Sequence, residues 1–311
     1  MTALDFGRLF LEATGLPVRE RVGLDQFSSF RIGGPADFFF EARTEEALKK
    51  AVCLAAREKF PFFVIGGGFN ILFDDAGYRG LIIRNRAEGV SAGESRISVV
   101  SGTGLGVLLQ SGLAAGLGGM EFLAGIPGTV GGALAGNAGA FGQSIGDLVE
   151  EAVLLSPDGG ERALPRSELA FGYRTSSMRG GRAIVLRAVI AASPGDRTAS
   201  EGKIRDYLEK RRTKHPPWGT ACAGSYFKNP CSADGTKVAA GRLLEQAGAK
   251  GLAAGGAAVY PGHCNFIINT GKATAADVLR LAAEMKERVL RLSGVLLEEE
   301  VICLPATASM L

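Results

Sequence analysis

The distribution of glycine constrains this chain more than any other feature of its sequence. Glycine accounts for 45 of the 311 residues, about 14%, which is roughly twice the usual ~7%. The excess is concentrated between Gly66 and Gly146 and shows no G-X-Y period, which excludes a collagen-like fibre. Because glycine has no side chain, this region can bring many backbone amides close to a ligand. The sequence therefore predicts a ligand site built largely from main chain.

The rest of the composition is that of a folded, multidomain globular protein. Apolar residues make up 46% and charged residues 22%, close to the globular averages, so disorder is excluded. At roughly 100 to 200 residues per domain, 311 residues predict two or three compact units. The net charge of +3 is consistent with an anionic small ligand and is too weak to indicate nucleic acid.

Cysteine and histidine usage indicates the cellular setting. The five cysteines are odd in number and scattered, without a C-x-x-C pair, and only two histidines are present. We therefore expect reduced thiols, a cytoplasmic location and no metal site. The N-terminus lacks the apolar core of a signal peptide, and the uncharged span 97–120 is too rich in glycine, serine and threonine to cross a membrane.

Helix and strand patterns alternate along the chain, which predicts an α+β or mixed α/β fold. A soft stretch at 193–196 predicts a domain boundary near residue 195. We expect helices after Thr44, at 105–115 and 203–212, and from a capping box of Thr274 and Asp277 to Gly294. We expect strands at 62–65, 81–83, 97–100, 149–155, 183–190 and 295–304.

Two glycine loops carry the strongest indication of a ligand. Gly66-Gly67-Gly68-Phe69-Asn70 directly follows a predicted strand, and a second loop at 125–132 runs into Asn137-Ala138-Gly139-Ala140. Glycine turns at strand ends can present successive N–H groups to a phosphate. Neither loop matches the GxGxxG of a Rossmann helix, so the ligand would be held differently. One such loop could be a simple turn, but two in one region favour a dinucleotide.

Several polar residues are candidates for chemistry, although each has an ordinary structural alternative. Arg174 could clamp a carboxylate or form a surface ion pair, and Ser225 could be reactive or an ordinary strand serine. Glu300 lies in a run of three glutamates, where strand alternation places it on the face of Glu298 and opposite Glu299. The basic cluster at 203–214 is more typical of a solvated helix face than of a phosphate site, and His215 and His263 are more typical of structural histidines.

Taken together, these segments resemble the UDP-N-acetylenolpyruvoylglucosamine reductase (MurB) family of peptidoglycan synthesis. The resemblance covers about residues 20 to 304, and its specificity comes from seven motifs in register. They are 28–36, 66–70, 124–132, 137–140, 171–176, 223–230 and 297–301.

The resemblance implies an α+β protein with an FAD-binding region of the p-cresol methylhydroxylase or vanillyl-alcohol-oxidase type. It implies an N-terminal segment at 1–19, an FAD-binding domain at 20–195 with subdomains of about 20–90 and 91–195, and a C-terminal α+β substrate-binding domain at 196–311. The short span after Arg174 resembles the compact second type of the family, which lacks a substrate-covering insertion. The implied cofactors are noncovalent FAD and NADPH as hydride donor, and the implied substrate is a UDP-sugar.

The resemblance also implies roles for particular residues. Arg174, Ser225 and Glu300 match the family's catalytic arginine, proton-donating serine and catalytic glutamate. Lys214, Lys228 and Asn229 match or lie near positions that hold the substrate. The cofactor-binding positions are Arg31, Gly66, Gly67, Gly68, Asn70, Gly125, Ile126, Pro127, Gly128, Thr129, Gly131, Asn137 and Gly139.

Two positions depart from the family pattern. Phe69 replaces a small hydroxyl residue after the glycines, which removes one possible hydrogen bond to phosphate. Glu299 replaces the usual proline before Glu300, which leaves that strand freer and could change the placement of the carboxylate.

Three other functions are compatible with parts of the sequence. A related flavin oxidase would often attach its flavin to His or Cys, and the glycine loops contain neither. A non-catalytic flavin-binding redox module differs from an enzyme in whether Arg174, Ser225 and Glu300 converge on one pocket. A basic nucleic-acid binder lacks any accompanying motif. We expect no nucleic-acid partner, no membrane insertion and a monomer.

Overall fold

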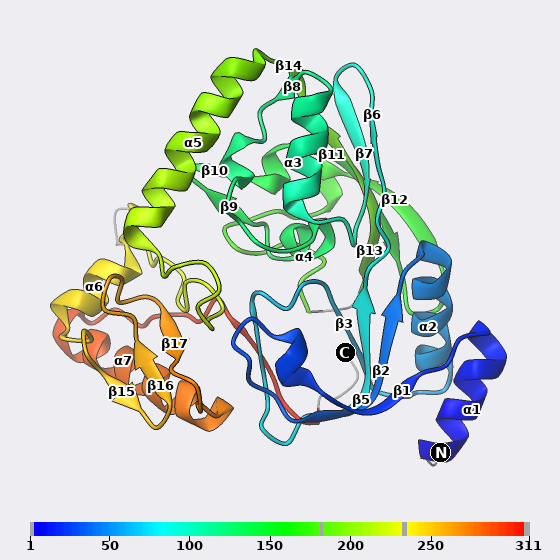
Figure 1. Cartoon of the computed structure of the whole chain (residues 1–311), viewed down its shortest axis with the longest axis horizontal. Coiled ribbons are helices and arrows are strands. Elements are labelled where there is room, and N and C mark those ends of the chain that lie inside the picture. Colours follow the sequence, from blue (N-terminus) through cyan, green and yellow to red (C-terminus); the bar gives the residue numbers. More distant parts are fainter. Residues whose placement is uncertain (1–2, 181–182, 232–234, 308–311) are drawn as a thin grey trace.

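A computed structural model describes residues 3–180, 183–231 and 235–307. Its elements form three groups, at the lower right, the top and the lower left of Figure 1. We call them the first, second and third lobes, in the order in which the chain enters them. The mixture of helices and strands in all three agrees with the expected α+β class.

The first lobe is a four-stranded sheet covered by helices. The strand order is β1-β2-β5-β3, with β1 antiparallel to β2 and the other pairs parallel. Helix α2 begins where predicted, because the Thr44 side chain accepts a hydrogen bond from the Ala47 N–H. The elements are α1 (Ala3–Thr14), β1 (Arg19–Gly23), η1 (Leu24–Phe27), β2 (Pro35–Ala42), α2 (Glu45–Arg57), β3 (Phe62–Ile65), β4 (Ile71–Phe73) and β5 (Tyr78–Asn85).

The second lobe contains the glycine-rich region and an antiparallel sheet in the order β12-β11-β13-β7-β6. Helices α3 and α4 pack on this sheet and share its apolar core. The elements are β6 (Val90–Ala92), β7 (Arg96–Val100), α3 (Leu105–Ala114), β8 (Leu117–Gly118), η2 (Glu121–Leu123), α4 (Val130–Ala135), β9 (Gly139–Ala140), β10 (Gln143–Ser144), η3 (Ile145–Asp147), β11 (Val149–Leu155), β12 (Glu161–Pro165), η4 (Arg166–Glu168), β13 (Ile184–Ala191) and β14 (Ser193–Pro194).

Helix α5 (Arg197–Lys214) leads from the second lobe toward the third (Figure 1). It begins beside the domain boundary expected near residue 195, yet it packs on the second lobe through Ile204 and Tyr207. The Ser200 hydroxyl donates a 2.6 Å hydrogen bond to the buried Glu121 carboxylate of η2. These contacts attach the helix to the glycine-rich lobe along much of its length.

The third lobe has a small three-stranded sheet packed on α7. Helix α7 has the predicted capping box of Thr274 and Asp277, and it ends at Gly294 in the left-handed conformation (φ 71°). The core of this lobe also includes Phe30, Ile32 and Leu72, which joins it to the first lobe. The elements are α6 (Ala240–Gln246), β15 (Ala253–Ala254), β16 (Ala257–Val259), β17 (Ile267–Asn269) and α7 (Ala275–Ser293).

The predicted strand over 295–304 is wrong in extent. Only β18 (Ile302–Leu304) is a strand, and it pairs in parallel with β4 of the first lobe. The preceding residues cross between the third and first lobes (Figure 1) and are held by isolated bonds to the 226–228 segment instead of a continuous ladder. A chain that changes partners midway cannot keep one regular register.

Two kinds of feature are absent from the described ranges. No helix in these ranges combines the length and apolar character needed to cross a membrane. The same ranges contain no group of three or more His, Cys, Asp or Glu side chains arranged to hold a metal ion.

Candidate active site

The fold brings the two predicted glycine loops into contact. A methyl group at Gly66 would overlap Thr129 Oγ1, and one at Gly67 would lie 3.6 Å from Gly128 Cα. Gly68 has a φ of +71°, and a methyl group there would overlap the Phe27 carbonyl. The close approach of the two loops therefore depends on glycine at position 66, and the packing of the first loop on Phe27 depends on glycine at position 68. We call residues 66–70 and 125–129 together the glycine cradle.

The cradle offers free backbone donors. Within the described part of the chain, none of the N–H groups of 66–70, Gly128 or Thr129 donates a hydrogen bond to another protein atom. Gly128 has a φ of +130° and open space where a Cβ would lie. Beside the first loop, Ser29 Oγ is buried and has no hydrogen-bond partner among the described residues, and the Ser29 N–H donates to the Gly68 carbonyl at 2.9 Å. Such unpaired donors fit the phosphates of a dinucleotide.

Asn137, a predicted cofactor-binding residue, uses its side chain within the protein. It is buried with a φ of 44°, its Nδ2 donates to the Gly172 carbonyl at 2.7 Å, and its Oδ1 accepts from the Gly146 N–H at 3.0 Å. These bonds fix the loop that carries Arg174. Gly139 in turn contributes its carbonyl to the same loop, as an acceptor for Arg174 Nη2 at 2.9 Å.

Phe69, within the cradle, and Arg31, another predicted cofactor-binding residue, have conformations that the sequence does not reveal. The Phe69 ring is 38% exposed and folds back over Gly67, so the departure from the family pattern places an aromatic face on the turn. Arg31 has a positive φ of 54° and an exposed side chain whose Nη2 donates to the Gly219 carbonyl at 3.1 Å. That bond connects the first lobe to the loop after α5.

Arg174 and Glu300 come together from two lobes. Arg174 Nε lies 2.7 Å from Glu300 Oε1, and the two side chains are 23% and 19% exposed. Among the described residues the buried Nε has no hydrogen-bond acceptor in line with its N–H, so the contact with Glu300 is an ion pair. Arg174 has a positive φ of 56°, and its carbonyl accepts a 2.6 Å bond from Arg179 Nη1.

The backbone around Glu300 is tied to the cradle. The Glu300 carbonyl accepts from Asn70 Nδ2 and from Arg179 Nη2, each at 3.2 Å. Burial raises the pKa of the Glu300 carboxyl, and the nearby Arg174 guanidinium opposes that rise only in part. The carboxyl is therefore easier to protonate than an ordinary glutamate.

Ser225 lies in a segment whose backbone is hydrogen-bonded to Glu300. The Glu300 N–H donates a 2.8 Å hydrogen bond to the carbonyl of Tyr226, the residue that follows Ser225. Gly224, before it, has a φ of +77° and open space around its Cα. The Ser225 hydroxyl makes no hydrogen bond to any residue that the structure describes. The three predicted catalytic residues thus lie in adjoining segments, and the serine hydroxyl is free to act on a ligand.

The predicted substrate-binding residues follow Ser225 directly or end α5. Lys228 Nζ pairs with Glu298, and its backbone N–H binds the Glu298 carbonyl at 2.8 Å. Asn229 Oδ1 accepts from the Ala240 N–H at 3.0 Å, so its amide caps the start of α6. Lys214 is exposed at the last position of α5.

Tyr173 is a site residue that the sequence analysis missed. Its hydroxyl accepts a 3.1 Å hydrogen bond from the Asn229 N–H, and the Lys237 ammonium lies 4.0 Å from its ring centroid. It adjoins Arg174 in sequence, and the Arg174 guanidinium lies 5.4 Å from the same ring. The sequence offered only that adjacency as a signal, because the partners in the third lobe are distant along the chain.

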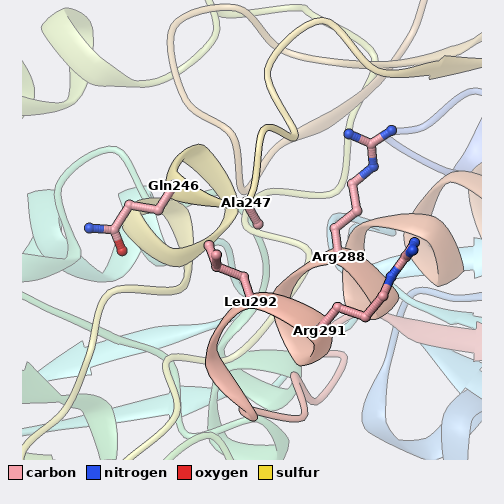
Figure 2. A pocket seen from close by; sticks show the side chains of 5 residues that line it. All are labelled: Gln246, Ala247, Arg288, Arg291 and Leu292. Atoms are coloured by element: carbon pink, nitrogen blue, oxygen red, sulfur yellow. The ribbon is translucent and has the colours of Figure 1, made fainter.

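A cavity of about 510 Å³ lies away from these residues, at the ends of α6 and α7 (Figure 2). Gln246, Ala247, Arg288, Arg291 and Leu292 line it. Its two arginines pair with Glu284 and Glu287 of the same helix, so their charge is already balanced. None of the predicted site residues contributes to it.

The two histidines form one aromatic cluster with Phe266. The ring centroids of His215 and His263 are 6.1 Å apart, and each lies within 5.1 Å of the Phe266 centroid. Burial lowers the pKa of both, that of His215 to about 4, with Arg211 adding to the effect on His215. Both rings are therefore neutral near pH 7, as expected of structural histidines.

Comparisons with known proteins agree with the geometry. The family described as UDP-N-acetylenolpyruvoylglucosamine reductase, C-terminal domain, matches residues 216–304, and an FAD binding domain matches 36–163. A UDP-N-acetylenolpyruvoylglucosamine reductase 2 of Symbiobacterium thermophilum is 41% identical over 286 residues, 91% of each chain. The reductase of Clostridioides difficile is 40% identical over 275 residues, 88% of each chain.

A solved structure is similar over nearly the whole chain. The crystal structure of UDP-N-acetylenolpyruvylglucosamine reductase (MurB) from Thermus caldophilus aligns with a TM-score of 0.76 and 33% identity. The alignment covers 93% of this chain and 100% of that one. The FAD binding domain and the similarity to these reductases make this chain a flavoprotein oxidoreductase. Within that class, this chain belongs to the UDP-N-acetylenolpyruvoylglucosamine reductase family.

Replacing Gly66 with alanine should weaken FAD binding roughly 10- to 100-fold, the effect of losing one charge-assisted hydrogen bond. The added methyl would collide with Thr129 Oγ1 and push the two loops of the cradle apart. Titrating the apoprotein with FAD and following the quenching of flavin fluorescence measures the change. Gly106→Ala is the matched control, since Gly106 lies in α3 with open space around it. Unchanged FAD affinity in Gly66→Ala would remove this loop from the cofactor site.

Proposed function

We propose that this protein reduces the enolpyruvyl ether of UDP-N-acetylglucosamine enolpyruvate to UDP-N-acetylmuramate, with NADPH as donor. The proposal rests on one observation above the others. Arg174 and Glu300 form a half-buried ion pair. The Glu300 carbonyl accepts a hydrogen bond from the Asn70 side chain, which connects the pair to the glycine cradle. A carboxylate-binding cation is thereby positioned beside a site for the phosphates of a dinucleotide.

The reaction needs a cation and a proton donor at neighbouring atoms. Bound FAD supplies hydride transfer from NADPH to the methylene carbon of the enolpyruvyl group. Negative charge then develops at the alpha carbon and its carboxylate, where the planar donors of Arg174 stabilise it. Ser225 Oγ donates the proton that the alpha carbon requires. Glu300 orients the Arg174 guanidinium, and its raised pKa suits it to share a proton with the substrate carboxylate.

A serine hydroxyl is a weak acid, so its setting matters. The unbonded Ser225 hydroxyl can turn toward the substrate, and the left-handed Gly224 before it keeps a side chain out of the way. Because the developing carbanion is a strong base, a weak acid close to it is sufficient.

The diphosphate of a UDP-sugar fits the cationic segment that follows Ser225. Lys228 and Asn229 lie there. Lys237, in the segment bridged to Cys231, and Tyr173 of the second lobe lie beside it. The Lys228 ammonium is already paired with an exposed Glu298, so substrate phosphate would compete with a weak, solvated partner. Lys214, at the end of α5, supplies a further charge.

The product of this reaction would be a peptidoglycan precursor, so we propose a role in cell-wall synthesis. The scattered, unpaired cysteines support a cytoplasmic location. We expect it to act as a monomer. Neither an oxygen-using oxidase nor a non-catalytic flavin module requires an arginine, a glutamate and a free serine together.

One spectroscopic experiment tests cofactor, donor and acceptor in turn. The purified protein should be yellow and should release all of its flavin on acid precipitation. Anaerobic NADPH should bleach the flavin absorbance, and the enolpyruvyl sugar nucleotide should restore it. Flavin retained in the acid pellet would contradict the noncovalent model. Reoxidation by oxygen but not by the sugar nucleotide would identify an oxidase, and no bleaching by NADPH would exclude this donor.

A further inference from the structure

The last turn of α5 brings one arginine against the glycine cradle. The basic cluster at 203–214 is more typical of a solvated helix face than of a phosphate site, and Arg211 departs from that expectation. A methyl group at Gly125 would meet its Cδ at 2.9 Å and its Nε at 3.5 Å. Its guanidinium also lies 5.4 Å from the centroid of the Phe141 ring, which stacks on Tyr207 of the same helix.

Arg211 has no acidic partner in the part of the chain that the structure describes. Among the described residues it forms no ion pair and no side-chain hydrogen bond, and its Nε is buried. The next residue, Arg212, has the opposite arrangement. Arg212 is 76% exposed and binds Glu209 through two donors at 2.8 Å. Arg212 is therefore a paired surface arginine, whereas Arg211 is partly desolvated and has no partner among the described residues.

The surroundings of Arg211 disfavour its charge. Burial lowers the pKa of its guanidinium, and the nearby Arg174 lowers it further. An arginine nevertheless stays protonated at neutral pH. A desolvated cation next to a like charge reduces folding stability unless an anion compensates it. The chain supplies no such anion among its described residues, so a ligand is the remaining source.

We propose that Arg211 binds the flavin itself, at the edge of the ring that gains negative charge when the flavin takes up electrons. The inference rests on the proposed function only in that FAD is the cofactor. Arg211 adjoins the cradle at Gly125 and faces the charge of Arg174, which pairs with Glu300. This position lies between the cofactor loop and the residues assigned to the reacting atoms. The free N–H groups of 66–70 and Gly128 already account for the phosphates.

The test is the midpoint potential of the bound flavin, measured without substrate. A charge-assisted hydrogen bond contributes about ten- to a hundredfold to an equilibrium. Arg211→Gln should therefore weaken the binding of reduced flavin relative to that of oxidised flavin by that factor. This change lowers the two-electron midpoint potential of the bound flavin by about 30 to 60 mV. Arg211→Lys should give an intermediate shift because it keeps the charge and loses the planar donors. Arg212→Gln is the matched control and should leave the potential unchanged.

A second measurement separates ligand binding from a structural role. Arg211→Met keeps the apolar stem and removes the uncompensated charge, so the apoprotein should melt at the same or a higher temperature than wild type. The gain in melting temperature on adding FAD should shrink in the same variant. A purely structural arginine would instead destabilise the apoprotein when replaced.

Three results would each overturn the assignment. An unchanged potential in Arg211→Gln removes Arg211 from the flavin ring. An equal loss of affinity for oxidised and reduced FAD assigns Arg211 to the pyrophosphate of the cofactor. An unchanged potential with a raised Kd for the sugar nucleotide assigns it to the substrate carboxylate. If the wild-type protein binds no FAD, both the role of Arg211 and the proposed function are contradicted. If it binds FAD but does not reduce the sugar nucleotide, only the proposed function is contradicted.

Discussion

Replacing Ser225 with alanine should leave the uptake of electrons from NADPH almost normal and slow their delivery to the sugar nucleotide by a factor on the order of 10²–10⁴. That range is the usual effect of losing a positioned acid. NADPH oxidation by the flavin needs no proton from this side chain, whereas reduction of the enolpyruvyl group leaves an alpha carbon that must be protonated. The serine lies next to the residue whose carbonyl fixes the Glu300 N–H, and its hydroxyl has no competing partner among the described residues.

Anaerobic stopped-flow absorbance follows the two half-reactions separately. Ser225→Cys should retain part of the second rate, because a thiol can also donate a proton. Ser91→Ala, at an exposed position in β6, should behave as wild type. A parallel fall in both half-reactions would make Ser225 structural, and no fall in either would mean that water or another group supplies the proton.

The parts of the fold that the sequence predicted correctly are those that depend on near neighbours. The cap of α2 by Thr44 and the capping box of α7 involve residues three positions apart, so their signals are complete within one turn. The glycine loops were predictable for a related reason. Their conformations need glycine locally, and the meeting of Gly67 with Gly128 then follows from close packing.

The parts that the sequence could not predict depend on contacts between lobes. The segment 295–301 alternates like a strand, but its hydrogen bonds go to single residues of another segment and not to a ladder. Arg211 and Arg212 are indistinguishable in the sequence, and only the packing of α5 on the Gly125 turn buries one and exposes the other. The mutual approach of Arg174 and Glu300, from different lobes, was suggested by family resemblance and not by spacing.

Arg174→Lys should reduce turnover by a factor on the order of 10²–10³ while FAD binding persists, which is the usual effect of removing a donor from developing negative charge. Lysine keeps the charge and loses the geometry. The Arg174 guanidinium pairs with Glu300 through Nε and donates to the Gly139 carbonyl through Nη2. A single lysine ammonium cannot make both contacts and also bind the substrate carboxylate.

Steady-state turnover and an FAD titration of the same preparation test this, with Arg162→Lys in exposed β12 as the control. Wild-type turnover in Arg174→Lys would remove Arg174 from the reacting centre. Joint loss of turnover and FAD binding would mean that its bond to Gly139 holds the second lobe in shape. A selective loss of turnover is expected because, among the described residues, the donors of the cradle at 66–70, Gly128 and Thr129 make no hydrogen bond to the Arg174 side chain.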